Sequence, residues 1–65
     1  MGKELRAYRL TDRIMKYTEG TGKYEDVLSK ARNYVNNNPV RWFSHVGDDY
    51  AARCIASSMT GKKLY

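Results

Sequence analysis

The sequence predicts an all-α fold, a compact bundle of three to four short helices in a single domain that covers residues 1–65. Two observations favour this class. Apolar side chains recur at helical spacing over residues 24–35. Residue types that begin or end helices stand at Asn38, Asp48 and Gly61. A chain this short buries only about 60% of the surface of its unfolded form, so we expect one small core.

The N-terminal segment, residues 3–18, fits a helix whose apolar positions fall into two separate groups. One group is Ala7, Leu10, Ile14 and Tyr17, and the other is Leu5, Tyr8 and Met15. A shorter helix capped by Thr11 and Asp12 is an alternative. A hairpin over residues 5–18 is a minority alternative and would make the fold α+β. The glycine-containing segment 19–22 ends this element in every version.

The second predicted helix covers residues 24–35. Six residues fall within an arc of about 120° on its surface: Tyr24, Val27, Leu28, Ala31, Tyr34 and Val35. Glu25 and Asp26 occupy its first turn, where the helix dipole favours negative charge. The asparagines before Pro39 stop it, because the residue preceding a proline is pushed out of the α region. We expect this helix to be the central apolar element, with Val27, Leu28, Ala31, Val35 and Ile55 buried.

The third predicted helix is short and covers residues 39–46. Asn38 is a good N-cap and Pro39 suits the first helical position, while Gly47 would end the element. A buried strand over residues 40–46 is the alternative, because valine, tryptophan and phenylalanine all suit strands.

The last predicted helix covers residues 49–60. Asp48 serves as its expected N-cap and Gly61 as the residue that follows its end. Cys54 is expected to be a small buried hydrophobe on this helix.

The formal net charge of +5 allows a polyanionic partner. Five basic residues of the N-terminal helix fall within an arc of about 140° and form what we call the basic stripe: Lys3, Arg6, Arg9, Arg13 and Lys16. Such a stripe can follow phosphate groups, although a solvated or protein-facing helix side is the interpretation we prefer. Trp42 and Phe43 point about 100° apart on a helix, so we expect one to anchor the core and the other an interface.

The sequence contains few residues of the types used in catalysis and metal binding. One histidine and one cysteine are too few for a nucleophilic triad or a structural zinc site. We therefore expect no enzymatic activity, no metal, no cofactor and no small-molecule substrate. No apolar run approaches the roughly 20 residues that a membrane span needs, so we expect no membrane association. A single cysteine and no secretory pattern favour the cytoplasm.

The predicted function is that of a small basic protein-interaction module. It would be an accessory subunit, inhibitor or adaptor that docks on a larger protein or on copies of itself, as suits a phage or mobile-element protein. The alternative is sequence-nonspecific nucleic-acid binding through the basic stripe.

Overall fold

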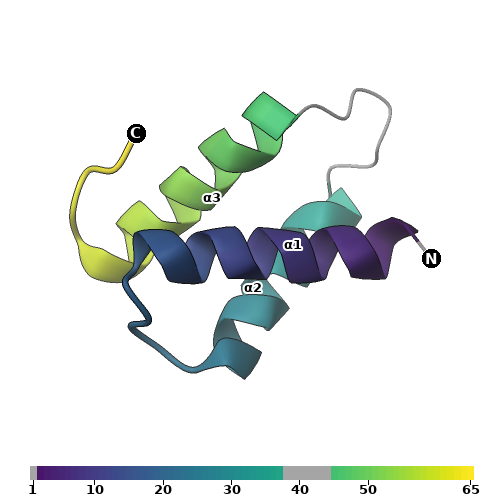
Figure 1. Ribbon diagram of the computed structural model, residues 1–65, viewed down its shortest axis with the longest axis horizontal. Coiled ribbons are helices and arrows are strands. Elements are labelled where there is room, and N and C mark those ends of the chain that lie inside the picture. The colour runs from purple at the N-terminus through teal and green to yellow at the C-terminus, as the bar shows by residue number, and fades with distance from the viewer. Residues whose placement is uncertain (1, 38–44) are drawn as a thin grey trace.

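The computed structural model describes residues 2–37 and 45–65, and within them the regular secondary structure is entirely helical (Figure 1). The helices are α1 (Gly2–Tyr17), α2 (Tyr24–Asn37) and α3 (His45–Thr60). The all-α class is thereby confirmed, and the hairpin alternative for the N-terminal segment is wrong because that segment forms α1. The predicted helix over residues 39–46 lies for the most part outside the described residues, and its last two residues belong to α3.

The central element of the bundle is α1. It packs against both α2 and α3, whereas α2 and α3 make only slight contact with each other. Figure 1 shows α1 crossing in front, with α3 above it and α2 passing behind it from below. The expectation that the second helix would be central is therefore wrong. The central position falls to α1 because both other helices pack against it.

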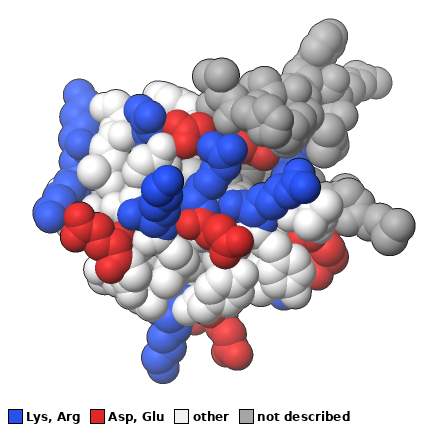
Figure 2. Space-filling view, in the orientation of Figure 1, with Lys and Arg blue, Asp and Glu red and all other residues white. Residues whose placement is uncertain are grey.

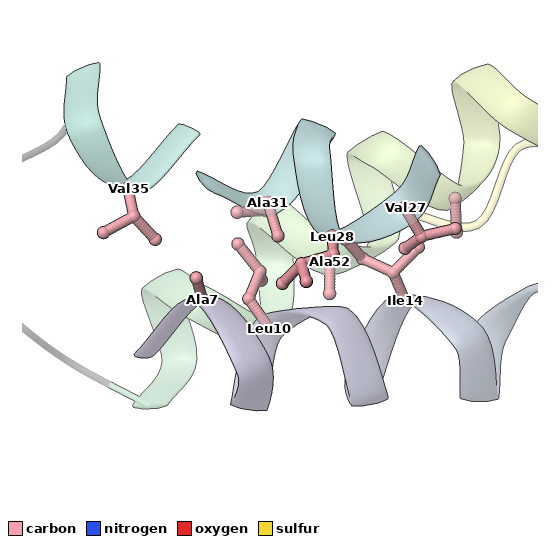
Figure 3. Close-up of a cluster of buried hydrophobic side chains, with 10 residues drawn as sticks. Ala7, Leu10, Ile14, Val27, Leu28, Ala31, Val35 and Ala52 are labelled. Atoms are coloured by element: carbon pink, nitrogen blue, oxygen red, sulfur yellow. The ribbon is translucent and has the colours of Figure 1, made fainter. Parts of the chain in front are cut away.

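The core is formed by one of the two apolar groups on α1 and by the apolar arc of α2. Their buried side chains point toward one another in Figure 3 and are Ala7, Leu10, Ile14, Val27, Leu28, Ala31 and Val35. Burial of the four α2 residues was predicted and is confirmed. The other α1 group is mostly outside the core, since Leu5 and Tyr8 are exposed and Met15 only packs against its edge.

Small residues make the contact from α3. Ala51, Ala52 and Ala56 are buried, while Ile55 packs against the core without being fully buried. The prediction that Ile55 would be buried is thus only partly met. Cys54 is half-buried instead of lying in the core. Because alanine removes little apolar surface from water, α3 adds less hydrophobic stabilisation than α2 does.

The start of α3 differs from the prediction. The helix begins at His45, so Gly47 does not end a preceding element and Asp48 is not an N-cap. The Asp48 side chain is buried in the contact with α1. Its carboxylate accepts hydrogen bonds from the guanidinium of Arg6 and serves the tertiary contact.

Left-handed residues end both α1 and α3. After α1, the N–H of Gly20 donates to the carbonyl of Met15 at 2.9 Å, and Glu19 occupies the left-handed region with φ 57°. This pattern is a Schellman motif with glutamate at its left-handed position. After α3, Gly61 has φ 74°, as expected for the residue that follows the helix.

Candidate functional site

The basic stripe lies along α1, where the structure describes most of it. Figure 2 shows Lys and Arg side chains running across the centre of the face that α1 presents, with Asp and Glu side chains on both sides. The side chain of Lys3 lies outside the described residues, as do Trp42 and Phe43. Arg9 and Lys16 are exposed, whereas Arg6 and Arg13 are partly buried.

Arg6 binds both carboxylate oxygens of Asp48 on α3 through one edge of its guanidinium. Its Nη2 donates to Oδ1 at 2.8 Å and its Nε donates to Oδ2 at 3.1 Å. Each side chain is only 10% exposed. Hydrogen bonding to Asp48 raises the pKa of Arg6 above its usual range. The guanidinium also lies over the ring of Tyr34 on α2, 5.9 Å from its centroid, so Arg6 connects α1 to both α2 and α3.

Asp49 collects a second set of partners from α1 and α3. The hydroxyl of Tyr17 donates to its Oδ1 at 2.5 Å, and Arg13 Nη1 donates to the same oxygen at 3.2 Å. Arg53 lies 3.0 Å from Oδ2 and stacks over the Tyr17 ring at 5.5 Å. The hydrogen bond from Tyr17 and the two arginines lower the pKa of Asp49.

The described cations of the basic stripe therefore fall into two groups, those that pair with aspartates of α3 and those that do not. Arg6 and Arg13 fasten α3 to α1, and their positive charge is balanced by Asp48 and Asp49. Arg9 makes no ion pair with any residue that the structure describes, and neither does Lys16. Sequence reasoning grouped these cations by their angle on the helix but could not separate the paired from the unpaired ones.

A different surface gathers exposed apolar groups from α1 and α2. Leu5 is 53% exposed, and Tyr8 and Tyr24 are each 42% exposed. Arg32 lies over the Tyr8 ring at 6.0 Å. We call Leu5, Tyr8, Tyr24 and Arg32 the tyrosine surface.

Neighbouring charges act on Arg32 and Tyr24 of the tyrosine surface. Arg32 donates to both carboxylate oxygens of Glu4 at 3.0 Å, which fixes its guanidinium beside Tyr8. The pKa of Tyr24 is raised by partial desolvation and then by the nearby charges of Asp12 and Tyr8. The sequence did contain a signal for this surface, because Leu5 and Tyr8 belong to the second apolar group on α1.

Other site types find little support among residues 4–37 and 47–65. No group of three or more metal-ligating side chains occurs there. None of the helices combines the length and the apolar character required to cross a membrane within the described part of the chain. Comparison with known proteins gives no match to a family model, a curated protein or a solved structure.

Proposed function

We propose that this chain is a small protein-interaction module whose partner docks on the tyrosine surface. The observation that carries the proposal is the exposure of three large side chains on α1 and α2, Leu5, Tyr8 and Tyr24, with Tyr8 near enough to Tyr24 to add to the desolvation that raises its pKa. Tyrosine and arginine are the residue types enriched at the energetic centres of protein interfaces. Tyr8 stacked beneath Arg32 offers both types at one place.

The geometry of Arg32 also favours a protein partner. Its bidentate bond to Glu4 holds the guanidinium over Tyr8 before any partner arrives. A contact group that is already ordered loses less side-chain entropy on binding. The tyrosine surface would thus act as a preformed anchor, in an accessory subunit, inhibitor or adaptor working in the cytoplasm on a larger protein or on copies of itself.

Nucleic-acid binding through the basic stripe is the weaker proposal. A phosphate contact by Arg6 would require it to leave Asp48, with which it shares a nearly buried ion pair. Removing one partner from such a pair is costly because the remaining charge is left without compensation. Among the described stripe residues, only Arg9 and Lys16 are exposed and without an ion pair. Two cations are few for a surface that has to contact a row of phosphate groups.

Site-specific photo-crosslinking tests the proposal. A benzophenone amino acid is placed at Tyr8 or Tyr24, with Asn33 on the exposed side of α2 as the matched control. We expect the first two positions to give a discrete protein adduct in cells and the control to give none. A differently tagged second copy shows whether the adduct is a homo-oligomer.

Two results would count against the proposed surface. The first is an equal yield of adduct from Asn33, which would mean that contact is not confined to the tyrosine surface. The second is an adduct that disappears on nuclease treatment, which would favour the nucleic-acid alternative.

A further inference from the structure

The C-terminal tail, residues 61–65, folds back along the outer side of α3. The N–H of Leu64 donates to the hydroxyl of Ser57 at 2.7 Å, and the Leu64 side chain packs against the edge of the core. The Tyr65 ring meets the Tyr50 ring edge to face, with centroids 6.1 Å apart. These contacts hold the tail to one face of the helix.

Between the tail and α3 lies an open depression of about 400 Å³. The residues of α3 that line it are Cys54, Ser57 and Ser58. The residues of the tail that line it include Lys62, Lys63 and Tyr65. The depression stays open because the α3 side chains that line it are small, and Ser57 alone of them has a described hydrogen bond to the tail. The lining contains two lysines and no acidic residue.

We propose that this depression binds an acidic peptide segment of a partner protein. Carboxylates of the peptide pair with the ammonium groups of Lys62 and Lys63, and an apolar side chain between them packs on the Tyr65 ring. Lys63 Nζ lies 5.8 Å from the centroid of that ring, so cation and aromatic face are already adjacent. The exposed hydroxyl of Ser58 adds a donor for a carboxylate oxygen.

The charge at this end of α3 fits a short acidic peptide better than a nucleic acid. Lys62 and Lys63 follow the C-terminal end of the helix, where the backbone dipole contributes about half a negative charge. The remaining positive charge suffices for one or two carboxylates, whereas a polyanion needs a longer row of cations. The site lies on α3 and the tail, so it is independent of the tyrosine surface on α1 and α2.

Fluorescence anisotropy tests this inference on the intact chain. The probe is a short labelled peptide of alternating glutamate and phenylalanine, compared with the same peptide carrying glutamine for glutamate and with a labelled oligothymidylate of equal length. We expect the glutamate peptide to bind most tightly. Lys62→Gln with Lys63→Gln should weaken it about fivefold, because two exposed ion pairs of about 0.5 kcal/mol each amount to about 1 kcal/mol.

A matched double variant, Lys23→Gln with Lys30→Gln, removes the same charge from exposed positions in and beside α2. It should change the affinity less than twofold, and amide shifts on peptide addition should concentrate in residues 54–65. The inference is wrong if both double variants lose equal affinity, if the glutamine peptide binds as well, or if the oligothymidylate binds more tightly.

Discussion

Arg6 and Asp48 stand 42 positions apart in the sequence and form a two-bond ion pair across the α1–α3 contact. The pair has a large part in placing α3, because the buried apolar side chains described on this helix, between residues 47 and 60, are alanines. Directional charged hydrogen bonds fix the rotation and height of a helix that small side chains alone leave free to slide. The position of α3 thus depends on charge more than that of α2 does.

The first prediction concerns this ion pair. Asp48→Ala leaves the Arg6 guanidinium nearly buried without its carboxylate, and should lower the free energy of unfolding by about 2 kcal/mol, below the range for a fully enclosed pair. Adding Arg6→Met should recover part of that loss. Urea denaturation of both single variants and the double variant measures the coupling.

The exposed pair of Glu4 and Arg32 serves as the control, and Glu4→Ala should lower the denaturation midpoint much less than Asp48→Ala does. Additive losses in the Arg6 and Asp48 variants would show that the ion pair does not stabilise the α1–α3 contact.

A second prediction follows from the lowered pKa values of Asp49 and Glu4. A carboxyl group whose pKa is lower in the folded state stabilises the fold above its unfolded pKa and loses that contribution as pH falls through the folded value. Stability should therefore decline as the pH drops below the ordinary values of 4.5 and 3.8. Thermal melts from neutral pH down to below pH 3.8 measure the decline.

Asp49→Asn removes one of these groups and tests its share of the acid dependence. The variant should show a shallower decline than the parent. An unchanged pH profile would mean that the Tyr17 and arginine contacts to Asp49 do not contribute to stability.

A third prediction uses the two helix ends, which carry different residues in the same left-handed conformation. Glu19 has φ 57° and Gly61 has φ 74°. Glu19→Gly should raise the free energy of unfolding by about 0.5–1 kcal/mol, because it removes left-handed strain at some cost in chain entropy. Gly61→Ala should lower it by about 1–2 kcal/mol, because left-handed strain outweighs the smaller chain entropy of alanine. A steric clash does not contribute, since no described atom outside the neighbouring residues lies within 4 Å of the added Cβ. Changes of the same sign would contradict the assignment of the Schellman motif.

The parts of the fold that the sequence predicted well depend on local signals. The apolar arc of α2 lies within one segment, so residues 24–35 could be placed without knowledge of any other element. The helix continues through Asn36 and Asn37, which were expected to stop it. Gly61 does end α3 through its own conformational freedom. Helix periodicity and end residues are properties of neighbours in the chain, which explains this success.

The parts that could not be predicted depend on distant residues. Asp48 is as good an N-cap as it is a partner for Arg6, and only the tertiary contact decides between these roles. The two apolar groups on α1 are equally compatible with a helix. Choosing the group that faces the core required knowing that α1 has two neighbours. The same limit applied to the basic stripe, because its angular pattern contains no information about carboxylates on α3.

A fourth prediction concerns the core. Leu28→Ala should lower the free energy of unfolding by about 2–5 kcal/mol, because Leu28 is nearly buried between α2 and α1. Leu5→Ala should change it by no more than about 0.5 kcal/mol, since Leu5 is exposed. Equal effects in urea denaturation would show that the exposed apolar group on α1 also packs against the fold.

The last prediction separates the paired from the unpaired cations of the basic stripe. Arg9→Gln with Lys16→Gln removes two exposed charges and should leave the unfolding transition unchanged, because neither residue makes an ion pair among the described residues. Arg6→Gln with Arg13→Gln removes the same net charge but should destabilise the fold, since both residues hold aspartates of α3.

For generic duplex DNA we expect weak binding that fades toward physiological salt, with a salt slope that falls by about one unit for each phosphate contact removed. Gel shifts over a salt series measure this slope. A tight complex that persists at physiological salt and is abolished by Arg9→Gln with Lys16→Gln, the double variant that stays folded, would overturn the protein-interaction proposal in favour of nucleic-acid binding.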